Sequence, residues 1–150
     1  MVRQIETIIV GGGQAGLATS YYLTQRGREY LVLEQAAQAA SAWRNDRWDS
    51  FTLVSPNWTL KLPGAEYHGA DLDGFLPRDQ IVDYFEQYID RFHVPLQFNT
   101  RVIAVERQAA GQRYRVTTDD TIYEAANVVV AAGLYQRPNR PVSSSLSERT

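Results

Sequence analysis

The chain has 150 residues, enough for one domain, and its 44% hydrophobic content is enough to fill a core. Its 15 basic and 17 acidic residues are scattered rather than clustered, which argues against nucleic acid or an anionic membrane surface as a partner. It contains no cysteine and only two histidines, so within this segment disulfides and thiolate metal sites are excluded, a metal site is not expected, and redox chemistry would require an organic cofactor.

The first predicted elements are a strand, a glycine turn, a helix and a second strand. Residues 7–10 form a short apolar run typical of a strand buried on both faces. A helix is expected over residues 14–26 and ends at Gly27. Residues 30–33 are the second buried strand, and a right-handed crossover would make the two strands parallel. The helical spacing places Ala15, Ala18, Tyr22 and Gln25 on one stripe of this helix.

Residues 35–77 lack a regular pattern and are rich in aromatic side chains. So long an irregular stretch in a compact domain is usually functional. A second helix is expected over residues 79–92, with Asp79 as its N-cap. Its buried face should pack against the sheet and contains Ile81, Val82, Phe85, Tyr88, Ile89 and Phe92.

The remaining chain is predicted to form strands joined by short turns. Their expected bounds are 96–98, 100–106, 114–118, 121–124 and 127–131. The middle strands should form a small antiparallel β-meander, and the last, which is apolar throughout, should return to the parallel sheet. Residues 137–150 are rich in Pro and Ser and indicate a linker. The fold class predicted is α/β, with a Rossmann-like, mostly parallel sheet.

One motif carries most of the chemistry. Residues 11–16 match G-x-G-x-x-G between a buried strand and a helix. Gly11 permits the tight turn, Gly13 lets a pyrophosphate approach the backbone, and Gly16 lets the helix pack closely on the strand. The free amides around Gln14 and Ala15, with the positive end of the helix dipole, would hold the diphosphate.

Glu34 ends the second strand, 23 residues after Gly11. A carboxylate there can accept both ribose hydroxyls of an adenosine and would repel a 2′-phosphate. The alternative is a glycine-rich turn with a surface glutamate, which the context disfavours. The pattern alone does not separate NAD from FAD, because both contain ADP.

Later segments resemble those of flavin-containing monooxygenases and the plant YUCCA enzymes. Ala131-Ala132-Gly133 with Pro138 and Pro141 is similar to the signature A-T-G-x-x-x-x-P-x-x-P, with Ala132 in place of the usual Thr. Residues 41–44, 53–56 and 62–63 resemble other segments of the family. Residues 47–58 also resemble a bacterial group of flavin-dependent oxidoreductases. The resemblance covers nearly the whole chain and implies a two-dinucleotide-binding flavoprotein.

Carried over residue by residue, the resemblance gives the pyrophosphate of FAD to Gly11, Gly13, Gln14 and Ala15, and the ribose to Glu34. It places Gln35, Trp43 and Arg44 along the cofactor, the backbone of Val102 at the adenine edge, and Ala132 and Gly133 close to the cofactor. Leu53 to Asn57 would lie nearer the isoalloxazine, where Pro56 stands in place of an Asn found in some family members. Packing remains the alternative for Trp43. For Arg44 and Arg47 the alternative is a solvated side chain or one paired with Asp46 and Asp49.

The resemblance implies that residues 1–136 are the first segment of an FAD-binding domain and 137–150 a linker toward an NADPH-binding domain outside this sequence. In this family NADPH reduces the flavin, which then passes electrons to dioxygen and oxygenates a small-molecule substrate. No catalytic residue is identified, because the flavin supplies the chemistry. The absence of cysteine argues against the glutathione reductase type, whose redox pair lies in the corresponding region.

Two other functions stay open: a NAD-dependent dehydrogenase, and a non-catalytic module that only binds FAD. Flavin absorbance would separate the first of these from the flavoproteins, and NADPH consumption would separate the enzyme from the module. Because no signal peptide or membrane-spanning stretch is evident, a cytoplasmic location and no membrane partner are expected.

Overall fold

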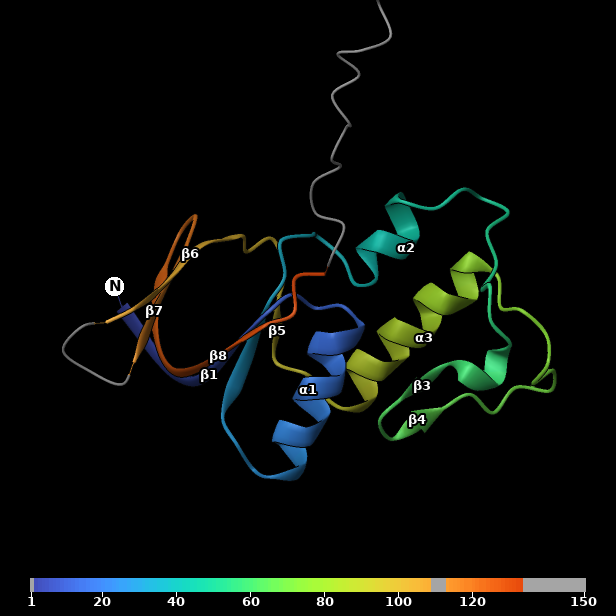
Figure 1. Ribbon diagram of the computed structural model, residues 1–150, viewed down its shortest axis with the longest axis horizontal. Helices are drawn as coiled ribbons and strands as arrows, with labels where there is room; N and C mark the ends of the chain where they lie inside the picture. The colour runs from blue at the N-terminus through green and yellow to red at the C-terminus, as the bar shows by residue number, and fades with distance from the viewer. Residues whose placement is uncertain (1, 109–112, 134–150) are drawn as a thin grey trace, which may run out of the picture.

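A six-stranded sheet organises the chain, and the computed structural model describes residues 2–108 and 113–133 of it. The strand order is β5-β2-β1-β8-β7-β6. The central pairs are parallel: β1 (Val2–Val10) lies between β2 (Tyr30–Leu33) and β8 (Ile122–Val130), and β5 (Leu96–Gln97) joins β2. Figure 1 shows this sheet at the left and centre, with the helices on its right. The predicted α/β class and its parallel core are confirmed.

The antiparallel meander is also confirmed. β6 (Val102–Arg107) pairs with β7 (Tyr114–Thr118), and β7 pairs with the first half of β8. The prediction of two separate strands over 121–124 and 127–131 was wrong, because β8 is one continuous strand. Its first half pairs with β7 on one side while its whole length pairs with β1 on the other, from Val2↔Ile122 to Val10↔Val130.

Helix α1 (Gln14–Gln25) follows the glycine turn, and Gly27 adopts the left-handed φ of 61° just after its end. The stripe that the spacing singled out is not the face turned to the core, since Ala15 and Gln25 are exposed and Tyr22 is 52% exposed. The residues that α1 buries are Gly16, Leu17 and Ser20. The small residues Gly16 and Ser20 allow close approach to the sheet, a feature that hydrophobic periodicity does not detect.

Helix α3 (Arg78–Arg91) begins one residue before the prediction and is preceded by Pro77, so Asp79 is a first-turn residue and not the cap. Its predicted apolar face is confirmed: Ile81, Val82, Phe85 and Tyr88 are buried, and Ile89 and Phe92 pack against them. This face completes one core with Ile9, Leu17 and Val32.

The opposite face of the sheet has a second core. It contains Ile8, Leu33, Val116, Tyr123 and Ala125, so the meander covers strands β1 and β2 on the side away from the helices. The stretch expected to be irregular holds four short elements: α2 (Ser41–Asn45), a 3-10 turn η1 (Asn57–Thr59), β3 (Lys61–Leu62) and β4 (Ala65–Glu66). In Figure 1, α2 lies above α3, and the β3–β4 hairpin lies below it.

The predicted linker, residues 137–150, and the last residues of the predicted first domain lie outside the described residues. Within the described ranges, no helix is long and apolar enough to cross a membrane.

Candidate functional site

The glycine turn connects β1 to α1 and is fixed by contacts with two other strands. Gly11 has a φ of 104°, and its amide donates to the Leu33 carbonyl at 2.8 Å. A Cβ on Gly11 would lie 2.5 Å from the Ala131 carbonyl oxygen and 3.2 Å from Cα of Ala132. The start of the Ala131-Ala132-Gly133 segment therefore lies directly against the turn.

The other two glycines of the motif have opposite surroundings. A Cβ on Gly16 would lie 2.0 Å from the Gly11 carbonyl oxygen, so only glycine fits where α1 crosses the turn. A Cβ on Gly13 would have no neighbour within 4 Å. Gly16 is thus required by the fold, whereas Gly13 faces open space at the start of α1.

The N-terminus of α1 opens onto that space. Its N-cap is Gly13, no side chain of the described residues caps it, and its first turn has no acidic residue. Gln14 and Ala15 are exposed. Because the first amides of a helix lack intrahelical acceptors, these groups are available to an anion, which the helix dipole also favours.

The Glu34 carboxylate lies beside this turn and is held by backbone amides. Its Oε2 accepts from the Gly12 amide at 2.7 Å, and its Oε1 accepts from the Ala36 amide at 2.9 Å. A carboxylate has about four acceptor positions, so each oxygen can still accept a hydroxyl. Glu34 is also half-buried, and the two hydrogen bonds hold its carboxylate in place before any ligand binds.

A neighbouring chain segment continues the same edge of the sheet. The Asn99 amide donates to the Ala36 carbonyl and the Thr100 amide to the Glu34 carbonyl, both at 2.9 Å. Val102 follows as the first residue of β6 and is partly buried. Gln35 is exposed between these contacts. Six of the sequence-predicted positions lie within three residues of the carboxyl ends of β1, β2 and β8: Gly11, Gly13, Glu34, Gln35, Ala132 and Gly133.

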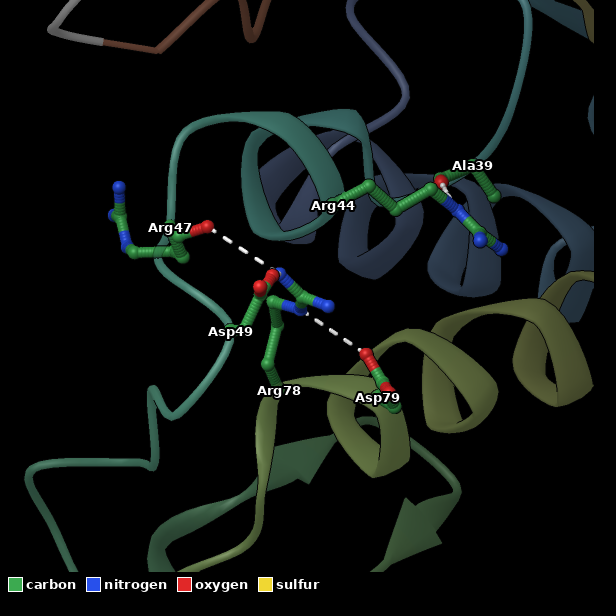
Figure 2. Close-up of polar contacts among 6 residues, drawn as sticks. All are labelled: Ala39, Arg44, Arg47, Asp49, Arg78 and Asp79. Atoms are coloured by element: carbon green, nitrogen blue, oxygen red, sulfur yellow. Dashed lines mark hydrogen bonds and ion pairs between the residues drawn. The ribbon is translucent and has the colours of Figure 1, made fainter.

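Trp43 and Arg44 lie on α2. The Trp43 ring packs on Phe51 with a centroid separation of 5.7 Å, and the Arg47 guanidinium lies 5.4 Å from the Trp43 ring centre. At least one side of the Trp43 ring therefore packs against other protein side chains, as the packing alternative states. Arg44 donates from Nε to the Ala39 carbonyl at 3.1 Å, and its guanidinium forms an ion pair with Glu86 of α3. Figure 2 shows the Arg44 side chain directed back to Ala39.

Among the described residues, neither Arg44 nor Arg47 forms an ion pair with Asp46 or Asp49, which was one of the two alternatives expected for them. Arg44 pairs with Glu86, and Arg47 donates to the backbone carbonyl of Asp46. Asp49 instead pairs with Arg78 at 2.8 Å, and Arg78 also contacts Asp79 at 3.0 Å (Figure 2). These hydrogen bonds raise the pKa of Arg78, with Asp79 the larger cause and Asp49 the next.

Asn57, which follows the Pro56 that stands in place of the family's Asn, is 3% exposed, and both polar atoms of its side chain are hydrogen-bonded. Its Oδ1 accepts from the Leu76 amide at 2.6 Å, and its Nδ2 donates to the Asp71 carbonyl at 2.8 Å. The side chain therefore joins two loop segments, 53–58 and 71–77, and has no free polar atom turned toward a ligand.

Sequence reasoning missed two contributors to this site. The amides of Gly12 and Ala36 fix Glu34, but a backbone donor has no signature in side-chain identity. Position in the motif was the available signal for Gly12, since it lies between Gly11, which the turn requires, and Gly13 at the start of α1.

Comparison with known families bears on this arrangement. Residues 8–146 match the family model described as pyridine nucleotide-disulphide oxidoreductase. The chain belongs to this oxidoreductase family. Since the chain has no cysteine, no disulphide chemistry of the family can come from these 150 residues.

Relatives within the family match nearly the whole chain. It is 36% identical over 150 residues to an uncharacterised CzcO-like oxidoreductase of Geobacillus kaustophilus, covering 99% of this chain and 42% of that protein. It is 30% identical over 132 residues to probable indole-3-pyruvate monooxygenase YUCCA10 of Arabidopsis thaliana, covering 84% of this chain and 34% of that one. The resemblances to YUCCA enzymes and to bacterial oxidoreductases are confirmed.

A solved structure agrees with the fold. The flavin-containing monooxygenase of Stenotrophomonas maltophilia superposes with a TM-score of 0.83 at 28% identity, covering 93% of this chain and 41% of that one. The oxidoreductase chain described here thus spans about two fifths or less of the length of these three proteins.

Proposed function

We propose that this chain is the FAD-binding part of an NADPH-dependent flavoprotein oxidoreductase of the monooxygenase type. The observation that carries the proposal is the Glu34 carboxylate, held by the Gly12 amide at 2.7 Å beside an uncapped helix N-terminus. One end of that site suits a ribose diol and the other a diphosphate, which are the two polar parts of an ADP group.

The residues present fit this cofactor. Gly13 leaves open the space that a Cβ would fill, and the amides of Gln14 and Ala15 can donate to the diphosphate. Glu34 would accept from the ribose, and the backbone near Val102 would border the adenine. Ala132 and Gly133, next to the Gly11 turn, would allow close approach of the cofactor, and Gln35 and Trp43 would extend the path along it.

The relatives support flavin as the remainder of the cofactor. A flavin-containing monooxygenase shares the fold at 28% identity, and YUCCA10 is named a monooxygenase. The chemistry that FAD supplies when bound is the transfer of two electrons from NADPH to dioxygen or another acceptor. The protein groups described here bind and orient the adenosine part, and we propose that a domain outside these residues binds NADPH.

The partners we propose are a small-molecule substrate and dioxygen or another electron acceptor, without nucleic acid or membrane. A cytoplasmic location is part of the same proposal. Cell fractionation with an antibody to the chain would check the location.

The experiment that tests the function uses the full protein that contains this chain. Purified protein should carry FAD, seen as flavin absorbance, and should consume NADPH in the presence of oxygen. A protein that binds NAD but no flavin would contradict the cofactor assignment. Flavin binding without NADPH consumption would instead support a non-catalytic module.

A further inference from the structure

Arg44 has a task in the structure that differs from a cofactor contact. The guanidinium donates to the Ala39 carbonyl at 3.1 Å and pairs with Glu86, so two of its donor positions are already used by protein groups. Ala39 and Ala40 are 6% and 8% exposed, so the Ala39 carbonyl belongs to a buried stretch where a polar group needs a partner.

The chain at this point is conformationally strained. Ala40 precedes α2 with φ 56° and ψ 31°, the left-handed region that an alanine adopts only where its surroundings enforce it. The Ala40 carbonyl accepts from the amides of Trp43 and Arg44 at 2.9 and 3.0 Å. The Arg44 side chain adds a contact just before the strained residue and a second one on α3. It therefore ties the start of α2 to a long, well-packed helix.

This tie acts at one end of the segment between Glu34 and α2. At the other end, Ala36 donates to the Glu34 carboxylate and accepts from the Asn99 amide, both at 2.9 Å. Glu34, Gln35 and Trp43 all belong to this segment or to α2. The position of the groups assigned to FAD thus depends on both anchors.

We propose that Glu86 is a positioning residue for cofactor binding, acting through Arg44 to hold α2 and the 34–40 segment in the arrangement that receives FAD. This inference rests on the proposed function. Holding the segment before binding removes part of the ordering cost that the cofactor would otherwise have to offset. Arg44 is then an anchor of α2 and not a ligand of the cofactor.

A double-mutant cycle on the full protein tests the proposal, with FAD affinity measured by fluorescence titration. Glu86→Gln should weaken FAD binding about two- to fivefold, the range for an ion pair whose side chains are 30% and 46% exposed. Arg44→Gln should weaken it more, since the Ala39 carbonyl also loses its donor. The double variant should bind no more weakly than Arg44→Gln alone, because both changes break one connection.

The salt dependence of FAD affinity separates a broken ion pair from a general loss of structure, which would not depend on salt in this way. The ratio of wild-type to Glu86→Gln affinity should approach 1 as the salt is raised to about 0.5 M, because a partly exposed ion pair is screened. Arg28→Gln is the matched control: it breaks the Arg28–Glu6 ion pair, which joins the residue stretch before β2 to the middle of β1, and should leave FAD affinity unchanged.

Each outcome decides the question. If Glu86→Gln binds FAD as tightly as wild type or more tightly while Arg44→Gln binds it weakly, Arg44 contacts the cofactor and the proposal is overturned. Additive effects of the two changes also overturn it. A wild-type protein that binds no FAD would overturn the proposed function itself, and the inference with it.

Discussion

Gly13 and Gly16 belong to one motif but differ in what surrounds them. Gly16 is buried against the Gly11 carbonyl, whereas Gly13 is exposed beside the helix N-terminus. A substitution at one should act on the fold, and a substitution at the other on the ligand.

Gly16→Ala should destabilise the chain by about 1–3 kcal/mol, since the added Cβ would lie 2.0 Å from a backbone oxygen that cannot move without opening the turn. Gly13→Val should leave the chain folded, because nothing lies within 4 Å of its Cβ, but should abolish FAD retention by filling the cofactor's space. Thermal unfolding and flavin content measure the two effects. Full flavin content in a folded Gly13→Val protein would show that the cofactor does not use this loop.

Glu34→Ala should affect both cofactor and fold. We expect FAD binding to weaken by about 1.5–3 kcal/mol, the usual range for hydrogen bonds to a charged group. Stability should also fall, because the amides of Gly12 and Ala36 lose the acceptor they bind at 2.7 and 2.9 Å. A titration with unchanged affinity, in a variant whose melting temperature has fallen, would restrict Glu34 to a structural role.

At the scale of elements, α3 is held to the β3–β4 hairpin by two tyrosine hydroxyls. Tyr84 accepts from the Leu62 amide at 2.8 Å and donates to the Ala65 carbonyl, and Tyr88 donates to the Pro63 carbonyl at 2.9 Å. Burial raises the pKa of both phenols above their ordinary value of 10.0. The hairpin is thereby packed against α3 through protonated hydroxyls.

Tyr88→Phe should cost about 0.5–1.5 kcal/mol of unfolding free energy at pH 8, the value of one hydrogen bond. Because the folded pKa of Tyr88 is raised, its contribution is complete below pH 10 and falls as pH rises past the unfolded value of 10.0. The stability gap between wild type and Tyr88→Phe should therefore narrow in urea unfolding at pH 11. Tyr22→Phe, at a 52% exposed position, is the control and should follow the wild type. A gap that widens with pH would contradict the assignment.

Helices and strands were predictable from the sequence where the hydrophobic pattern matches the residues that the fold buries. The face of α3 was predictable because a single helix side is apolar and faces one core. The stripe of α1 was not, since that helix buries Gly16 and Ser20 for close approach and leaves Tyr22 outside. The continuity of β8 was hidden because its two halves have different neighbours: one is half of a hairpin, and the other is central in a parallel sheet.

In the candidate site, too, some features could be predicted from the sequence and others depend on the tertiary fold. The places of Gly11, Gly13, Gly16 and Glu34 at the turn and at the end of β2 were predictable from the spacing of the motif, whereas their contacts with a cofactor stay a prediction. The Arg44–Glu86 pair was not, since 42 residues separate its members and only the packing of α2 on α3 brings them together. Asn57 was similarly hidden, because its bonds to Asp71 and Leu76 depend on how a loop folds back.

At the scale of the whole molecule, the described sheet has two edges of different character. β5 has two residues, whereas β6 has six and exposes Ile103 and Val105, at 61% and 40%. An exposed edge strand with apolar side chains favours association between chains. We therefore expect the isolated 150-residue chain to aggregate more readily than the longer protein, which light scattering would measure.

The isolated chain should also fail to turn over NADPH. A two-dinucleotide flavoprotein needs a separate glycine motif for its nicotinamide cofactor, and these 150 residues contain one G-x-G-x-x-G. That motif is already occupied in the proposal by FAD, with Glu34 beside it, a carboxylate that would repel the 2′-phosphate of NADPH. One site of this kind cannot hold the electron donor and the flavin together.

The measurement is NADPH absorbance with excess FAD, comparing residues 1–150 with the longer protein. The short chain should bind FAD weakly, because the parts of the site beyond the adenosine would remain open to water, and NADPH should not be consumed above the rate of free FAD. The longer protein should consume it. Turnover by the short chain at roughly 1 per second or faster, an ordinary enzymatic rate, would show that these residues alone bring donor and flavin together. The division of labour between two glycine motifs would then be wrong, and Glu34 would have to tolerate a phosphate next to its carboxylate.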